Sequence, residues 1–510
     1  MPAEAAPPPL REAVLTGRFF GRADGAAGGA LAALIASQDA GCVLRDWFGE
    51  ARLATIARDE QPAEALRGAI DRDIAKIDQM LSTQLDAVLH AARLRRLEGS
   101  WRGLAWLVDR MAGGGGRIRV KLLTARWTEI CRDLERAVEF DQSQMFRKVY
   151  EEEFGTAGGK PFGLIAADYE IRHLPSPTHP TDDVGALTAL AGVAAAAFTP
   201  IVLAASPELV GLDAFADAGP AFDIASVLQG PEHARWRNAA AQDDMRFLCV
   251  ALPRVLARAP WADDGARADR FRYRGHAAGA AQRVWTTPVY ALAAVAIRAF
   301  ERFGWPGEVR GAEPQEDAAG GVVDGLAWER FASDPPDGPP PRPPLDLALT
   351  DEQERQISDG RLVPLSALEA QAEASFGALP SLHRPPRMNT AIAEANQRLS
   401  TQVNSLLCVS RFAHCIKLMG RDMVGSGREA EEVERQLQNW LNRFVSGLGS
   451  GGAEVTAKYP LLDAKIEVRE RRGKPGVYGC TIHLQPHHQL DEVGAAFRLV
   501  TEFAPRRVAA

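Results

Sequence analysis

The sequence predicts a soluble protein of mixed α/β (α+β) class, with more than one domain, long helices and a mostly antiparallel C-terminal sheet. Three observations lead to this prediction. The chain has 510 residues, which is more than one ordinary hydrophobic core holds together. Helix-length segments alternate with short apolar runs between about residues 100 and 330. Strand-like alternation follows near the C-terminus.

The composition fits a cytoplasmic protein. Hydrophobic residues make up 46% of the chain and charged residues 25%, and the formal net charge is -7. Because neither sign of charge dominates, we expect neither nucleic acid nor an anionic membrane surface as a partner. The six cysteines show no CxxC or other ligand spacing, which fits reduced thiols in the cytosol better than a disulfide framework.

We expect neither an export signal nor direct membrane insertion. Met1 to Pro9 lacks a basic start followed by an apolar run. Gly185 to Ala205 is uncharged and long enough to cross a bilayer, but it consists mostly of Ala, Gly and Thr and is interrupted by Pro200. The prediction is therefore a buried helix over about residues 184–197, followed by a short core strand from Pro200 to Ala205.

Residues 1–60 have the composition of a flexible arm. They are rich in Ala, Gly and Pro with short apolar patches, so we expect them to gain order from a partner. From about Glu64 to Leu97, apolar side chains recur every three or four residues, which predicts one long amphipathic helix. The apolar side chains of this helix form a stripe that would pack either on its own domain or on another subunit, and the sequence favours neither. The stripe comprises Ile70, Ile74, Ile77, Leu81, Leu85, Val88 and Ala92.

Residues 61–333 form the predicted N-terminal α/β region. Its strands are expected at Arg117 to Leu123, Phe162 to Ala167, Pro200 to Ala205 and Phe247 to Leu252. The proline-rich stretch 334–344 follows. Because proline removes backbone donors and fixes φ, this stretch is expected to be an extended connector or a surface loop.

Residues 345–510 form a predicted C-terminal domain of two helices and a sheet. Apolar spacing predicts a helix over residues 399–423, and Ser426 with Glu429 has the capping-box spacing that opens a second helix. An exposed sheet edge in such a domain is a template for a strand from another chain. The strands are expected at Ala464 to Arg471, Val477 to Leu484 and Ala495 to Phe503, with Gly473 to Gly476 as a hairpin turn.

No pattern predicts a catalytic, cofactor or metal site. The segment Gly155 to Pro161 resembles a phosphate loop but lacks its first glycine and the Ser or Thr that would hold Mg²⁺. His483, His487 and His488 lack a convincing further ligand of set geometry.

An α/β enzyme would need a convergent polar site. The trio Asp168, Tyr169 and Glu170 is the candidate for it, and a strand end leading into a loop is the preferred interpretation. We therefore expect a protein that is not an enzyme.

Several blocks of the sequence resemble one protein family in the family's order. Leu94 to Val108 contains LEGSWRGL, which closely resembles the signature of the TssC/VipB family of type VI secretion sheath proteins. The resemblance covers about residues 60–504. Further blocks are Arg132 to Tyr169, Val193 to Leu212, Leu252 to Ala257, Ser410 to His414, Gly473 to Gly476 and Leu484 to His487.

The resemblance implies a phage-tail-sheath-like fold and the role of the large subunit of a contractile sheath. In the family, this subunit pairs with a small sheath subunit (TssB/VipA-like), and the heterodimers polymerise helically around a tube of stacked Hcp rings on a baseplate. Contraction drives the tube outward, and a ClpV-type AAA+ ATPase then dismantles the sheath in the bacterial cytoplasm. The subunit itself needs no cofactor.

The resemblance also implies which residues contact partners. The family's ATPase recognises an N-terminal helix of this subunit, and Gly29 to Ser37 is the positional match, with Leu31, Leu34 and Ile35 on one face. The family links protomers through exchanged strands, here with the arm before residue 60 as donor. The implied interface residues of the C-terminal sheet are Ile466, Val468, Tyr478, Ile482, Leu484, Phe497 and Leu499.

The sequence departs from the family at two motifs. Val284 to Thr287 stands where an aromatic-Trp-Gly-Asn motif is common, and Pro486-His487-His488 where Pro-His-Phe is common. A divergent paralogue that acts as a non-polymerising adaptor of the sheath is therefore the alternative to a standard subunit. An adaptor would form a stable heterodimer without tubules.

Overall fold

The protein was analysed as a computed structural model of the whole chain. The residues described are 10–17, 26–111, 117–156, 158–219, 222–263, 265–268, 270–273, 275, 279–311, 320–330, 333–335, 338, 342–369, 371–386, 397, 400–424, 429–446, 453–470, 478–486 and 497–503. Contacts between residues divide the chain into two compact units. One comprises Met1–Arg95 and Pro260–Arg283, and the other comprises Arg96–Ala259 and Val284–Ala510. The domain boundaries expected from the sequence stay predictions.

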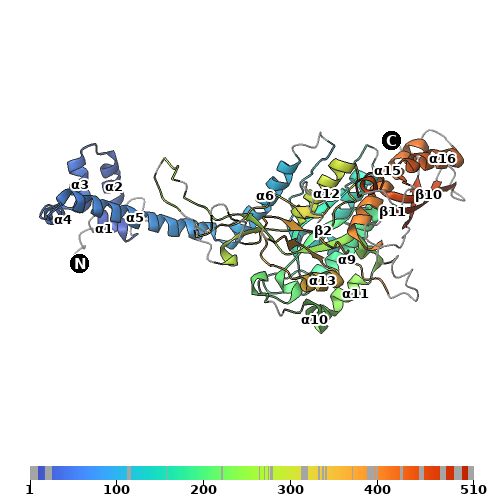
Figure 1. Cartoon of the computed structure of the whole chain (residues 1–510), viewed down its shortest axis with the longest axis horizontal. Coiled ribbons are helices and arrows are strands. Elements are labelled where there is room, and N and C mark those ends of the chain that lie inside the picture. Colours follow the sequence, from blue (N-terminus) through green and yellow to red (C-terminus); the bar gives the residue numbers. More distant parts are fainter. Residues whose placement is uncertain are drawn as a thin grey trace. The chain divides into compact units, whose positions relative to one another are not determined.

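The first unit is helical in its described N-terminal part. Short helices occupy much of the segment expected to be a flexible arm (Figure 1). The helices are α1 (Leu10–Leu15), α2 (Ala26–Ala36), α3 (Ala40–Phe48), α4 (Glu50–Ile56) and α5 (Pro62–Leu89). Two of them, α1 and α3, bind the buried carboxylate of Asp73 on α5, which accepts hydrogen bonds from Arg11 Nε at 2.6 Å and Trp47 Nε1 at 2.9 Å.

The long helix predicted from Glu64 to Leu97 is in fact two helices. Helix α5 ends at Leu89, and α6 (Ala92–Arg110) begins after a short break. The backbone N–H of His90 donates to the carbonyl groups of Asp86 and Val88, which closes the last turn of α5. Apolar spacing continues through this break, so the spacing alone could not reveal it.

A parallel four-stranded sheet forms the centre of the second unit. Its strands lie in the order β1-β2-β3-β7, and every neighbouring pair is parallel. Strands β2 and β3 are buried along their whole length, which explains their continuous apolar sequence. The strands are β1 (Ile165–Ile171), β2 (Ile201–Ala205), β3 (Leu248–Leu252) and β7 (Val363–Pro364).

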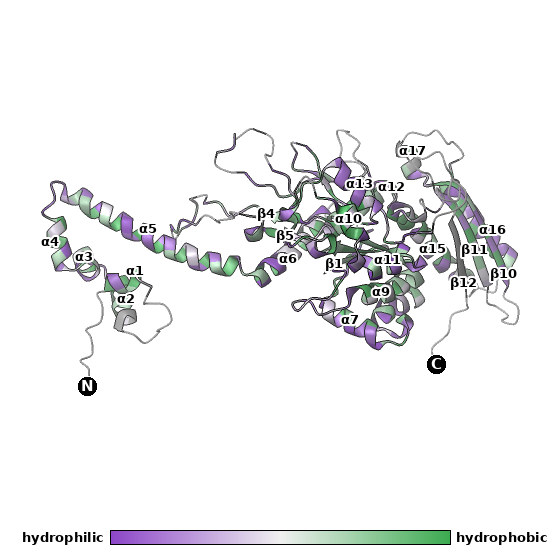
Figure 2. Cartoon of the chain, turned by 90° about the horizontal axis from the view of Figure 1, so that it is seen from below, coloured by the Kyte–Doolittle hydropathy of each residue, from purple (hydrophilic) through white to green (hydrophobic). Residues whose placement is uncertain are grey.

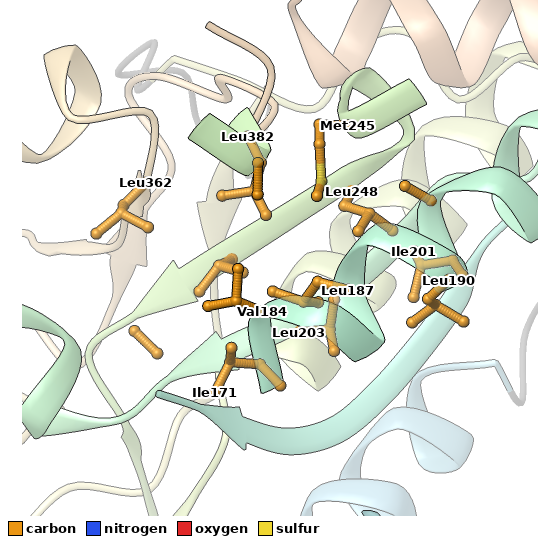
Figure 3. Packing of buried hydrophobic residues seen from close by; sticks show 14 of the residues in the cluster. Ile171, Val184, Leu187, Leu190, Ile201, Leu203, Met245, Leu248, Leu362 and Leu382 are labelled. Atoms are coloured by element: carbon orange, nitrogen blue, oxygen red, sulfur yellow. The ribbon is translucent and has the colours of Figure 1, made fainter. Parts of the chain in front are cut away.

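Each face of this sheet carries its own hydrophobic core, because successive side chains of a strand point to opposite faces. Leu203 and Leu248 pack with Leu187 of α9 (Asp183–Ala197) on one face (Figure 3). Val202 and Cys249 pack with helix α12 (Val289–Phe303) on the other face. The buried helix and the core strand expected at 184–205 are therefore confirmed.

Smaller elements complete the two units. The further strands are β4 (Val255–Arg258), β5 (Val284–Thr286), β6 (Val322–Val323), β8 (Ser366–Ala367) and β9 (Ala374–Ser375). The further helices are α7 (Trp127–Arg136), α8 (Gln144–Phe146), α10 (Ile224–Gln229), α11 (Ala234–Ala240), α13 (Asp351–Asp359) and a π-helical segment at Arg147–Gly155. Single 3₁₀ turns lie at Phe140–Gln142, Pro207–Val210, Phe215–Asp217, Pro231–His233, Asp243–Phe247, Ala280–Gln282 and Asn442–Phe444.

The C-terminal region contains two long helices and an antiparallel sheet, which confirms the prediction for this region. The sheet order is β10-β11-β12, and both pairs are antiparallel. Its inner face packs on the helices around Phe412 and Leu437. The elements are α15 (Val403–Val424), α16 (Ala430–Leu441), α17 (Ala453–Lys458), β10 (Leu461–Glu470), β11 (Tyr478–Pro486) and β12 (Phe497–Phe503).

One predicted strand is wrong. Arg117 to Leu123 forms no strand, because this segment finds no neighbouring strand among the described residues. Ser426, the Gly473 to Gly476 turn, His487 and His488 lie outside the described residues. Among the helices that the structure describes, none is both long and apolar enough to span a bilayer.

Candidate assembly surfaces

The LEGSWRGL segment forms helix α6, and its glycines allow the helix to touch a strand. A Cβ atom on Gly99 would overlap the carbonyl oxygen of Trp285, and one on Gly103 would overlap the hydroxyl of Thr286. The four-residue spacing puts both glycines on one helix face. The glycines of this signature therefore serve direct packing of α6 on β5.

A buried ion pair fixes α6 to the neighbouring strand β4. The carboxylate of Glu98 accepts hydrogen bonds from Arg258 Nε at 2.6 Å and from Arg102 Nε at 2.7 Å. Burial alone would raise the pKa of Glu98, but the hydrogen bonds from the two guanidinium groups lower it below its ordinary value. Glu98 thus stays ionised and holds the helix in register with the strand.

The opposite face of α6 is apolar and uncovered. Leu97, Trp101 and Val108 lie about one turn or two turns apart, and each side chain is roughly half exposed. An exposed tryptophan on a helix that is otherwise well anchored is typical of a protein–protein contact. The signature therefore combines an anchoring face with a free apolar face.

The SRFAH block also serves packing inside the unit. His414 on α15 is buried, and its Nε2 donates a hydrogen bond to the carbonyl oxygen of Ala197 at the end of α9, at 2.9 Å. Burial lowers the pKa of His414 to about 4, so the imidazole is neutral at physiological pH. It therefore fastens two helices and does not act as a charged group.

The trio Asp168, Tyr169 and Glu170 lies inside strand β1, where each side chain has a partner within the unit. Asp168 accepts hydrogen bonds from the hydroxyl groups of Thr287, at 2.7 Å, and Tyr290, at 3.1 Å. The Tyr169 hydroxyl donates to a backbone carbonyl at 2.6 Å. These contacts tie β1 to the start of α12 and to the segment before α7.

Glu170 belongs to a buried charge cluster at the end of the parallel sheet. Its carboxylate accepts hydrogen bonds from both Nε and Nη2 of Arg254, at 2.6 and 3.0 Å. Asp346 accepts the backbone N–H of Arg254 at 2.9 Å, while its nearest guanidinium nitrogen lies 3.7 Å away. Burial would raise the pKa of Glu170, but the ion pair with Arg254 lowers it. Burial raises the pKa of Asp346 to about 7.

Two neighbouring carboxyl groups with different pKa values, such as Glu170 and Asp346, are also the arrangement of a catalytic acid–base pair. Such a pair would need a cavity through which a substrate reaches it. A cavity of about 420 Å³ in the second unit is lined by Trp106, Tyr290 and Trp328, among others, but not by Asp168, Glu170 or Asp346. Through Arg254, the cluster joins β1, the end of β3 and the chain before α13.

The segment that resembles a phosphate loop binds a carboxylate of the same chain, that of Glu153. Glu153 accepts the backbone N–H of Lys160 at 3.1 Å and forms an ion pair with Lys121. Gly159 packs against the carbonyl oxygen of Glu153, where a Cβ atom would overlap it. An amide that a phosphate would need is thus already bonded to an anion.

Helix α5 of the first unit presents an uncovered apolar seam, which we define as Ile74, Leu81 and Val88. These side chains are 50%, 40% and 58% exposed and repeat every seven residues along one face. Figure 2 shows hydrophobic and hydrophilic residues alternating along this helix. The sequence left open whether the stripe packs within the chain; the part of the chain that the structure describes leaves the seam exposed.

The predicted ATPase-recognition residues lie on a short helix of the same unit. Leu31 and Leu34 of α2 are half-buried, whereas Ile35 is exposed. Their place on one helix agrees with the expected Gly29 to Ser37 segment, and their role as a recognition site stays a prediction.

The predicted interface residues of the C-terminal sheet point into its own core. Ile466, Val468, Ile482 and Leu484 are buried, and Tyr478 is partly buried against the same cluster. These side chains therefore belong to the core of their own domain, and their role as interface residues stays a prediction. Phe497 and Leu499 lie on β12, where they are paired with Leu484 and Ile482, and their interface role stays a prediction.

Side chains of helix α16 bind one edge of this sheet, a contact that the sequence did not predict. The side-chain amide of Gln438 donates to the carbonyl of Ala464 and accepts from the N–H of Ile466, at 2.8 and 3.0 Å. Glu434 accepts the N–H of Val468 at 2.8 Å. These side chains bond the outward backbone groups of β10 that an added strand would need, and α16 lies beside the sheet in Figure 1.

Comparisons with known proteins identify what these surfaces belong to. Residues 71–383 match the VipB family, described as EvpB/VC_A0108, tail sheath N-terminal domain. Residues 392–503 match VipB_2, described as EvpB/VC_A0108, tail sheath gpW/gp25-like domain. The chain is 31% identical over 439 residues to the type VI secretion system sheath protein TssC1 of Pseudomonas aeruginosa, covering 85% of this chain and 86% of that protein.

A solved structure of a sheath tail protein from Desulfitobacterium hafniense superposes with a TM-score of 0.32 and 8% sequence identity, covering 66% of this chain and 57% of that one. The two family matches together span most of the chain, and the relative matches it along nearly its whole length. The chain therefore belongs to the VipB (TssC) family, the large subunits of the type VI secretion contractile sheath.

Proposed function

We propose that this chain pairs with a small, TssB/VipA-like sheath subunit and that the heterodimers polymerise around an Hcp tube on a baseplate. Contraction of this lattice would eject the tube, and a ClpV-type ATPase would recycle the sheath in the bacterial cytoplasm. The subunit would work by assembly alone, without catalysis, nucleic acid or membrane insertion. Family membership supports the structural role, and the surfaces above support the partners.

The uncovered seam of α5 carries the pairing proposal. Apolar side chains that repeat every seven residues favour packing against a second helix, because each then faces the partner once in two turns. Burying them releases ordered water and supplies free energy for association. Leu97, Trp101 and Val108 of α6 offer a second apolar face of the same kind. A helical segment of the small subunit is the occupant that fits.

The C-terminal sheet would link one protomer to the next. Because α16 bonds the outward groups of β10, we propose that an exchanged strand adds at the outer edge of β12. The segment before residue 60 is the proposed donor, and part of its helices α1 to α4 would have to unfold to supply a strand. The helix α2, with Ile35 exposed, is the proposed contact for the ATPase.

Co-purification tests the pairing. The chain should be co-expressed with a candidate small sheath subunit from the same genome, with an affinity tag on the small subunit only. We expect the two chains to elute together in equal amounts by light scattering after gel filtration. Elution of the small subunit without this chain would contradict the proposal.

A further inference from the structure

The segment Ile118 to Thr124 is exposed except at Ile118, which is partly buried, and its backbone has no hydrogen-bond partner among the described residues. None of its backbone N–H or C=O groups bonds to any part of the chain that the structure describes. Its side chains nevertheless alternate like those of a strand, with Ile118, Val120 and Leu122 between basic residues. A segment with strand-like alternation, whose backbone groups have no partner among the described residues, is typical of a strand that pairs with another chain.

The basic row of the segment holds it on its own unit. Arg117 donates to the carbonyl oxygen of Glu301 at 3.0 Å, and Lys121 forms an ion pair with Glu153. The ammonium group of Lys121 also lies over the ring of Phe162, 5.6 Å from its centroid. Basic side chains on one side are thus anchored, which directs the other row away from these contacts.

Two residues of the apolar row face outward, whereas Ile118 is partly buried. Val120 is 43% exposed and Leu122 is 59% exposed, while Leu123 beside them is 50% exposed. Branched and apolar side chains on a solvent-facing strand favour pairing with another strand, where they pack against cross-strand neighbours. A helix could cover the side chains, but only a strand could also satisfy the backbone groups.

We propose that Ile118 to Thr124 becomes a β-strand by pairing with a strand of the small sheath subunit. The proposal rests on the pairing proposed above and adds a second contact to it. The strand predicted at Arg117 to Leu123 stays absent from the structure of the single chain.

The partner is the small subunit and not a neighbouring protomer for a physical reason. An uncovered edge with an apolar row promotes aggregation for as long as it stays open. A lattice neighbour covers a surface only after polymerisation, whereas in the pairing proposed above the small subunit would be bound already in the soluble building block. The edge must therefore be closed in the heterodimer.

Hydrogen exchange of the purified heterodimer tests the proposal. The amides of residues 118–124 should exchange at least tenfold more slowly than the intrinsic rates of the same sequence. Exchange at intrinsic rates in an intact heterodimer would overturn the strand while leaving the pairing proposal standing. Protection that appears only in tubules would assign the strand to a lattice neighbour and overturn the choice of partner.

Two single proline variants provide an independent measurement. Neighbouring residues of a strand direct their N–H groups to opposite edges, so Arg119→Pro and Val120→Pro together test both edges. At least one of them should weaken binding of the small subunit tenfold or more. The chain alone should stay folded, because neither N–H bonds to the described part of the chain. Val120→Thr keeps the N–H and the branched shape and is the matched control; equal binding by all three variants would overturn the proposal.

Discussion

The seam of α5 allows the pairing surface to be tested with a calculated effect. Replacing Ile74, Leu81 and Val88 with alanine removes about eight carbon atoms, and alanine favours the helix. Because the three side chains are 50%, 40% and 58% exposed, roughly half of this surface is left for a partner to cover. At about 0.8 kcal/mol per buried CH₂ group, the loss is about 3 kcal/mol of binding free energy, or roughly a hundredfold in Kd.

The assay is a titration of the purified chain with the small subunit, followed by light scattering or interferometry. The matched control carries Lys76→Ala, Gln79→Ala and Thr83→Ala on the opposite, exposed face of α5. The control should bind as the natural chain does, and both variants should keep its thermal unfolding temperature. Equal affinities of the two variants would refute the assignment of the seam.

Three further predictions concern the fold that presents these surfaces. Ile482→Pro should cost about 3 kcal/mol or more, because β11 is the central strand, paired on both sides, and proline removes one of its ladder hydrogen bonds; soluble protein with normal tubules would show that the strand is misassigned. Gly99→Ala should lower the unfolding temperature through the overlap with Trp285, whereas Gly68→Ala, whose Cβ would meet only a flexible arginine at 3.5 Å, should raise stability by about 0.5–1 kcal/mol. Asp346→Asn should remove a pH dependence of stability. The carboxyl group of Asp346 keeps its proton up to about pH 7 in the folded protein, but only up to about pH 4 in the unfolded chain. Between these two pH values, the natural chain therefore loses stability relative to the variant as the pH rises. Urea unfolding of both proteins at pH 5 and pH 8 measures this difference, and an equal difference at both values would contradict the assignment.

Local patterns in the sequence predicted the central buried strands and most of the C-terminal elements correctly. The apolar run before Ala205 and the one before Pro253 became buried parallel strands, and the three C-terminal strands pair as expected. These elements could be predicted because burial on one or both faces leaves a local period in the sequence. The family was likewise identifiable, because ordered blocks such as LEGSWRGL reflect packing that few other residues satisfy.

Contacts between distant segments could not be predicted. Glu98 pairs with Arg258, and Gln438 bonds the edge of β10, but neither pair leaves a periodic signal. The same reason applies to the strand predicted at Arg117 to Leu123, since alternation shows strand chemistry but not whether a partner strand exists in the same chain. The exposure of the α5 seam could not be predicted either, because it depends on whether distant segments of the chain pack on this face.

Electron microscopy of this chain co-expressed with the small sheath subunit tests the sheath role most directly. We predict hollow, ridged tubules with a lumen wide enough to enclose an Hcp tube, and we predict that the seam variant of α5 forms none. A soluble heterodimer that never forms tubules, with or without Hcp, would contradict the polymerising role and favour the non-polymerising adaptor.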